Sequence, residues 1–141
     1  MSITESLMAS IKVVCGVIIK DGCVLLCRRK LEKSLGGFWE FPGGKVEHNE
    51  TKEDSLVREL REELSMEVSN INYLTTSKHS YDEFDITLIA YTCAFVSSNW
   101  LMLDHDAFEW VFPEKLLDWE LAPADIPVAE FIINGKQLTT A

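Results

Sequence analysis

Two apolar stretches near the start of the chain have the composition of β-strands. Residues 11–20 (IKVVCGVIIK) and 23–29 (CVLLCRR) are rich in β-branched and apolar side chains. They are separated by Asp21-Gly22, a dipeptide that is typical of a two-residue hairpin turn. We therefore predict two antiparallel strands that are joined by a tight turn.

A helix is predicted to begin after Thr51. The Thr51 side chain can cap it, with Asp54 three residues further on, and the acidic first turn suits the positive end of the helix dipole. At about 100° per residue, one arc of the helix is apolar and consists of Leu56, Val57, Leu60 and Leu64. An adjoining arc is acidic and consists of Glu59, Glu62 and Glu63. The helix can therefore pack on a sheet while its glutamates lie at the edge of that contact.

The rest of the pattern predicts a layered fold. Residues 84–96 (FDITLIAYTCAFV) have apolar residues at both parities, as expected for a central strand that is covered on both faces. The other expected elements are a loop over 30–37, the short segment 38–41 with a turn at 42–45, a strand at 108–112, a short helix over 113–119 and a terminal helix from Asp125 to a stop at Gly135. Layers on both faces of a mixed sheet make an α/β/α sandwich, in the α/β (α+β) class.

Length and composition indicate how the chain is organised. With 141 residues, the usual length of one domain, residues 1–141 are expected to form a single domain in which residues 1–9 are a disordered leader. No apolar run is long enough to cross a bilayer, and the first ten residues lack the features of a secretory signal. We therefore expect a cytoplasmic protein without a membrane partner. The cysteines lie in apolar, strand-like segments and are expected to be buried free thiols: Cys15, Cys23, Cys27 and Cys93.

The balance of charges argues against one class of partner. Thirteen basic and twenty-three acidic residues give a formal net charge of −10, which repels a nucleic-acid backbone, so duplex binding is not expected. A small phosphorylated ligand is compatible with this charge if a divalent cation lies between its phosphates and the carboxylates of the protein. The sequence is compatible with either a monomer or a homodimer.

The acidic arc of the helix needs compensation. Glu59, Glu62 and Glu63 stand at i, i+3 and i+4, where like charges on one helical face repel each other. One interpretation is a solvated face on which Arg58 and Arg61 are ion-pair partners. The other is a site for Mg²⁺ or Mn²⁺, because three carboxylates supply the hard oxygen ligands that these ions prefer.

The segment around this helix resembles the sequence box of the Nudix hydrolases, G-x5-E-x7-R-E-U-x-E-E-x-G-U with U aliphatic. The matching residues are Gly44, Glu50, Arg58, Glu59, Leu60, Glu62, Glu63 and Met66. The one departure is Ser65, which stands where the family has a glycine at the helix end, and there a glycine eases a left-handed turn. Residues 38–43 (FWEFPG), just before the box, add to the resemblance.

This resemblance implies the Nudix fold and a metal-dependent hydrolase. It implies that Mg²⁺, with Mn²⁺ as an alternative, is bound by box carboxylates and by a backbone carbonyl of the preceding turn: Glu59, Glu62, Glu63 and Gly43. It implies that Glu62 or Glu59 helps the metal to activate the attacking water. Arg58 and Glu50 are implied to form an ion pair that orients the loop and the helix.

Four residues near the box carry further expectations. Gly43 and Gly44 are expected to allow a close backbone approach and unusual dihedral angles. Asp104 stands where relatives carry a glutamate that acts as metal ligand or general base, and an ordinary loop residue is an equal alternative. His105 is expected to be a solvated loop residue.

Outside the box, the chain is similar to the compact MutT-type branch of the family, and most of all to bacterial CTP pyrophosphohydrolases. The similarity is carried by residues 43–47 (GGKVE), 56–64 (LVRELREEL) and 121–127 (LAPADIP). It implies that a nucleoside triphosphate, above all CTP, dCTP or a modified cytidine nucleotide, is hydrolysed to the monophosphate and pyrophosphate. The alternatives are a hydrolase of oxidised purine triphosphates such as 8-oxo-dGTP and a nucleotide-sensing module without turnover.

The same similarity indicates substrate-binding residues. Asp125 has the position that reads the base: its carboxylate can accept a hydrogen bond from cytosine N4 and, when protonated, can also donate one. Capping of the terminal helix is a second role, and both can hold. Tyr81 falls where an aromatic lies against the base, and Arg29, rather than Arg28, falls where an arginine contacts the nucleotide; a strand-end aromatic and an exposed charge are the plain alternatives. The other expected contacts are Phe41 and Gly44.

Overall fold

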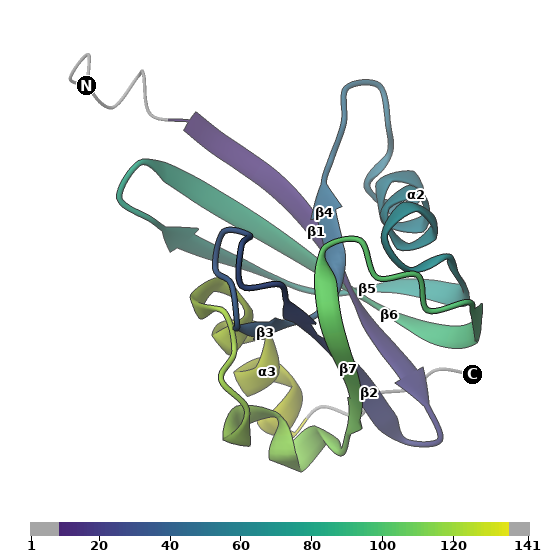
Figure 1. The fold of residues 1–141 in the computed structure, drawn as a ribbon. Coiled ribbons are helices and arrows are strands. Elements are labelled where there is room, and N and C mark those ends of the chain that lie inside the picture. The colour runs from purple at the N-terminus through teal and green to yellow at the C-terminus, as the bar shows by residue number, and fades with distance from the viewer. Residues whose placement is uncertain (1–8, 136–141) are drawn as a thin grey trace.

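The computed structural model describes residues 9–135 (Figure 1). Within these residues the strands are β1 (Ala9–Lys20), β2 (Cys23–Arg29), β3 (Trp39–Glu40), β4 (Gly43–Lys45), β5 (Met66–Ser80), β6 (Phe84–Ser98) and β7 (His105–Val111). The helices are α2 (Lys52–Leu64), α3 (Ile126–Ile133) and the 3₁₀ helices η1 (Pro113–Asp118) and η2 (Pro123–Asp125). The leader expected at residues 1–9 lies outside the described residues, except for Ala9, which already belongs to β1.

All seven strands of the described chain belong to one mixed sheet. The order is β3-β2-β1-β6-β5, with β4 beside β1 and β7 beside β2. β1 runs parallel to β6 and antiparallel to β2 and β4. The hairpin predicted around Asp21-Gly22 is present, and both of its turn residues have positive φ angles.

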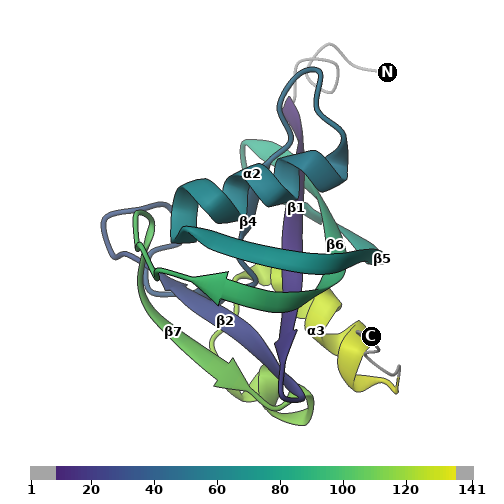
Figure 2. The same ribbon diagram turned by 90° about the vertical axis from the view of Figure 1, so that its right-hand side faces the viewer.

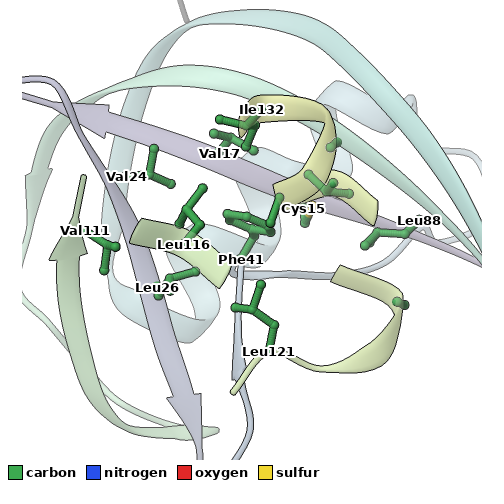
Figure 3. Close-up of a cluster of buried hydrophobic side chains, with 14 of the residues drawn as sticks. Cys15, Val17, Val24, Leu26, Phe41, Leu88, Val111, Leu116, Leu121 and Ile132 are labelled. Carbon is green, nitrogen blue, oxygen red and sulfur yellow. The ribbon is translucent and has the colours of Figure 1, made fainter. Parts of the chain in front are cut away.

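The two helices cover opposite faces of the sheet (Figure 2). α2 packs its apolar residues on one cluster, which includes Val14 and Ile18 of β1. α3 and η1 pack on the other cluster, in which Phe41 lies beside Leu116 and Ile132 lies beside Val17 (Figure 3). Residues 88–91 of β6 alternate between the two clusters. The α/β/α sandwich with a mixed sheet is therefore confirmed.

The predicted signals at both ends of α2 are confirmed. The Thr51 hydroxyl accepts a hydrogen bond from the Asp54 N–H (3.0 Å). Ser65 ends the helix in the left-handed conformation with φ 53° and ψ 43°. On the apolar arc, three leucines are fully buried, whereas Val57 is only half-buried and Ser55 is buried instead. Ser55 can be buried because its hydroxyl donates to the Glu50 carboxylate (2.5 Å).

The structure corrects several predicted elements. The sequence pattern missed β5 altogether, residues 43–45 are a strand rather than a turn, and β7 begins three residues earlier than expected. The helix predicted from Pro113 is a 3₁₀ helix, and α3 starts at Ile126, directly after a 3₁₀ turn. All four cysteines are free thiols, and three of them are buried; Cys23 is half-buried. None of the described helices has the length and apolar composition needed to cross a membrane.

Candidate active site

A cavity of about 540 Å³ lies against the N-terminal half of β1. This volume falls within the usual range for sites that bind small ligands. Its lining brings together all five residues that the sequence indicates as substrate contacts: Arg29, Phe41, Gly44, Tyr81 and Asp125. They come from β2, from the segments around β3 and β4, from the β5–β6 turn and from η2, so the fold gathers them from distant parts of the chain.

Asp125 is a buried carboxyl group in the wall of this cavity. Its side chain accepts a hydrogen bond from the Phe41 N–H (2.9 Å) and does not cap α3, so the capping role expected from the sequence is wrong. Burial raises the pKa of Asp125 well above its ordinary value, and the nearby charge of Glu40 raises it further. Burial thus favours the protonated form of Asp125, and in that form the carboxyl group can both donate and accept a hydrogen bond.

The backbone around Asp125 is fixed by three hydrogen bonds to other elements. The Trp39 N–H donates to the Glu120 carbonyl and the Ala122 N–H donates to the Trp39 carbonyl, both at 2.8 Å. The Ser77 hydroxyl of β5 donates to the Ala124 carbonyl at 2.9 Å. The position of the Asp125 carboxyl is thus determined by β3 and β5.

Glu40, which sequence reasoning missed, is a second carboxylate in the cavity wall. Its Oε2 atom accepts hydrogen bonds from Arg29 Nη1 (3.2 Å) and from His105 Nε2 (2.8 Å). The Nε group of Arg29 donates to the Ser34 carbonyl at 2.6 Å. The segment FWEFPG drew attention to the neighbourhood of Glu40 but gave no signal that its carboxylate would be buried there.

His105 is the clearest error of the sequence interpretation. It is not a solvated loop residue: it begins β7, lies opposite Arg29 of β2 and is 1% exposed. Arg28, by contrast, pairs with Asp106 (2.7 Å) at a partly exposed position and does not line the cavity. Of these two arginines, Arg29 alone lines the cavity.

The two glycines at the start of the box, Gly43 and Gly44, allow close packing rather than unusual dihedral angles. A Cβ atom on Gly44 would overlap the Glu59 carboxyl group, and one on Gly43 would overlap the Val14 carbonyl. Both glycines lie in β4 and neither has a positive φ angle, so the expectation of unusual dihedrals is wrong. The missing side chain of Gly44 leaves the space that the Glu59 carboxyl occupies.

Arg58 is the centre of an ion-pair network at the base of α2. Its Nε donates to Glu50 (2.6 Å), as predicted, and its Nη2 donates to the Lys45 carbonyl (3.1 Å). Its Nη1 contacts both Glu59 (3.2 Å) and Glu62 (3.1 Å). Hydrogen bonds from Arg58 and from the Ser55 hydroxyl lower the pKa of Glu50 to about 2. Arg58 therefore joins the loop, β4 and the helix.

Glu63 and Asp104 share one hydrogen-bonded site on the other side of the acidic arc. Burial raises the pKa of Glu63 to about 8, and the hydrogen bond to Asp104 and its charge add to this effect. The same hydrogen bond, followed by the Lys33 ammonium at 3.1 Å, lowers the pKa of Asp104. The structure thus places Asp104, which the sequence indicates as a metal ligand, next to Glu63 of the box, so Asp104 is not simply a solvated loop residue.

The donor set of this region fits a divalent cation. Within residues 9–135, no three carboxylate, histidine or cysteine side chains are already arranged as a metal-ligand set. The carboxylates nevertheless supply hard oxygen atoms, and burial raises the pKa of Glu59 as well as that of Glu63. Burial disfavours the charged forms of Glu59 and Glu63, and a cation beside them would favour these forms. The side chains that would hold the cation are Glu59, Glu62, Glu63 and Asp104.

Comparisons with known proteins agree with this geometry. The family described as "NUDIX domain" matches residues 14–130. The CTP pyrophosphohydrolase of Escherichia coli is 39% identical over 123 residues, which cover 87% of this chain and 91% of that protein. The 8-oxo-dGTP diphosphatase of Proteus vulgaris is 47% identical over 74 residues, 52% of this chain and 66% of that protein. The crystal structure of a MutT NUDIX hydrolase from Burkholderia pseudomallei has a TM-score of 0.77 at 25% identity and covers 86% of this chain and 96% of its own.

Proposed function

Since the chain belongs to the NUDIX domain family and is a Nudix hydrolase of the nucleotide pyrophosphohydrolase type, we propose that its substrates are cytidine triphosphates, CTP and dCTP, and that its cofactor is Mg²⁺, with Mn²⁺ as a substitute. The products are the monophosphate and pyrophosphate. The observation that carries the proposal is the pair of carboxyl groups, Asp125 and Glu40, in the wall of one cavity. The relation to a CTP pyrophosphohydrolase over most of both chains supports it.

The chemistry of the two carboxyl groups suits the edge of cytosine. A neutral Asp125 can donate a hydrogen bond to the ring nitrogen N3 and accept one from the N4 amine. A protonated carboxyl group could also bind uracil, because it can accept a hydrogen bond from the ring N3–H and donate one to the O4 carbonyl. Glu40 has no such freedom, because its Oε2 already accepts two hydrogen bonds and an ionised carboxylate is an acceptor only. Glu40 therefore favours a base that carries an amine.

Other residues of the cavity suit the rest of the nucleotide. Tyr81 gives an aromatic ring on which a base can stack, whereas Phe41 is buried in the core and contributes its N–H, which holds Asp125. Arg29 keeps one nitrogen, Nη2, with only a long contact of 3.5 Å to the Ser34 hydroxyl, so it can donate to a phosphate or a sugar oxygen. Gly44 lies between this cavity and Glu59, which joins the site of the base to the site of hydrolysis.

The box residues supply the reaction. A bound divalent cation would neutralise phosphate charge and lower the pKa of the attacking water. Glu62, whose side chain is 58% exposed, or Glu59 accepts the proton of that water as it attacks. By analogy with the MutT branch, water oxygen bonds to the β-phosphorus, the bond to the α–β bridging oxygen breaks, and the nucleoside monophosphate leaves. Arg58 holds Glu50, Glu59 and Glu62 in register without contacting the phosphorus.

Hydrolysis of a nucleotide panel tests the proposal. Purified protein with Mg²⁺ should release monophosphate and pyrophosphate from CTP and dCTP fastest, and EDTA should stop the reaction. Glu62→Gln should abolish turnover in a protein that still unfolds cooperatively, whereas Glu53→Gln, on the same helix but at a variable position of the box, should stay active. A folded Glu62→Gln variant with normal activity would refute the assignment of the box, and a panel without any turnover would favour the nucleotide-sensing alternative.

An oxidised purine is the second candidate substrate. The relative from Proteus vulgaris is named an 8-oxo-dGTP diphosphatase. Its identity to this chain, 47% over 74 residues, is higher than the 39% of the CTP pyrophosphohydrolase over 123 residues. An oxidised guanine also presents N–H groups to an acceptor such as Glu40. Values of kcat/KM measured side by side for CTP, dCTP, 5-methyl-dCTP and 8-oxo-dGTP decide between the two classes.

A further inference from the structure

His105 makes a buried contact that the proposed reaction does not use directly. Its side chain is almost fully buried and does not line the cavity. Its Nε2 lies 2.8 Å from Glu40 Oε2, and among the described residues its buried Nδ1 atom has no hydrogen-bond partner. An unpaired buried nitrogen is costly, so the fold keeps this imidazole at the expense of stability.

The contact fixes both the proton on the ring and the orientation of Glu40. A carboxylate oxygen accepts hydrogen bonds, so the hydrogen of the imidazole must lie on Nε2. Arg29 approaches the same oxygen, Oε2, at 3.2 Å, and Arg29 itself is held by the Ser34 carbonyl. With Oε2 held by two donors, the Glu40 carboxylate cannot turn freely, and no donor within residues 9–135 contacts its Oε1 atom.

We infer that His105 is a positioning residue that holds Glu40 as a fixed acceptor in the cavity wall and so makes the site select bases with an amine over bases with a carbonyl at the same position. The inference rests on the proposed function, because it names the group that gives that site its preference. Without His105, Glu40 keeps only the longer bond to Arg29. The Glu40 carboxylate can then turn away from the substrate, and its repulsion of a carbonyl oxygen on the base is lost.

The ratio of kcat/KM for CTP to kcat/KM for UTP measures this preference. The wild type should favour CTP at least tenfold, and His105→Leu should reduce the ratio by about tenfold, the effect of losing one hydrogen bond to a charged group. The loss should appear in KM rather than in kcat. His105→Gln, whose amide can donate at a similar position, should keep most of the preference.

Two controls separate this role from general damage. Asp106→Asn alters the neighbouring ion pair with Arg28 on the same two strands, outside the cavity, and should leave the ratio unchanged. Nitrogen-15 NMR of the wild type should show the proton of His105 on Nε2. A proton on Nδ1 of a neutral ring, or an unchanged ratio in a folded His105→Leu, would overturn the inference.

The outcomes also distinguish this inference from the proposed function. A wild type that hydrolyses neither CTP nor UTP would refute the proposed substrate, and the NMR measurement would still decide whether His105 donates to Glu40. A wild type with the cytidine preference and a His105→Leu variant with the same preference would leave the function standing and refute the role of His105. If His105→Leu does not fold, the comparison rests on His105→Gln, which must then retain the preference, and on the position of the ring proton.

Discussion

Replacing Ser65 with glycine should stabilise the protein. Ser65 ends α2 with φ 53° and ψ 43°, and its N–H bonds to the carbonyls of Leu60 and Arg61. For a residue with a Cβ atom, the left-handed conformation costs roughly 1–2 kcal/mol. Glycine avoids this cost but loses more backbone entropy on folding, by roughly 0.5–1 kcal/mol. The Ser65 hydroxyl makes no hydrogen bond within residues 9–135 that the substitution would remove.

The midpoints of these two ranges leave a gain of about 0.75 kcal/mol. For a chain of 141 residues, this gain should raise Tm by about 2–4 °C. Because Ser65 is not a proposed metal ligand, kcat should change by less than about twofold, equivalent to about 0.4 kcal/mol. The residue at which this chain departs from the Nudix box thus affects the stability of the helix end rather than catalysis.

Denaturant unfolding followed by circular dichroism measures the gain. The midpoint should rise for Ser65→Gly while the m value stays the same. Ser69→Gly is the matched control, because it makes the same chemical change at an exposed position in β5, where glycine should lower the midpoint. A midpoint that falls for Ser65→Gly, or one that rises equally for both variants, would refute the argument from the left-handed backbone.

Three further changes test other parts of the structure. Gly44→Ala places a Cβ atom in the space of the Glu59 carboxyl and should lower kcat by at least tenfold while the fold remains, as activity and circular dichroism will show. Glu50→Gln should lower Tm at pH 7. Pairing with Arg58 lowers the pKa of Glu50 from 4.5 to about 2, so the stabilising effect of Glu50 is present above pH 4.5 and disappears towards pH 2. The difference in Tm between wild type and variant should therefore shrink over that range. Leu60→Ala should lower the free energy of unfolding by about 3 kcal/mol or more, because Leu60 is fully buried on the sheet-facing side of α2. Tm in a thermal scan should fall by roughly 10 °C.

Local signals explain why α2 and the first hairpin could be predicted from the sequence. The Thr51 cap, the leucine spacing and the Asp21-Gly22 turn each depend on residues that are close together in the sequence, so they can be recognised from the sequence alone. β5 lacks such a signal, because its register shifts at three places and its buried residues do not alternate. Strand pairing with β6 holds β5 in place, and this interaction is not visible in the pattern of β5 alone.

The candidate site divides in the same way. A sequence motif indicates the box residues, and a family resemblance indicates the five residues that line the cavity. Glu40 and His105 are separated by 65 residues and meet only because β3 and β7 both pair with β2. Their contact depends on register across three strands, and a one-residue shift of β7 would put His105 on the other face. The pairing of a buried acid with a buried base is therefore a property of the assembled sheet.

The position of Arg29 shows how an acidic protein can hold an anionic substrate. Its charge opposes the rise that burial causes in the pKa of Asp125, and it adds to the effect of the Glu63 hydrogen bond that lowers the pKa of Asp104, so one guanidinium acts on both acidic groups. It is also bound to Glu40, which receives a second hydrogen bond from His105. Because His105 shares the task of holding Glu40, Arg29 does not have to direct all of its donors at that carboxylate. Arg29 can therefore turn a free donor to the nucleotide without releasing the acceptor that selects the base.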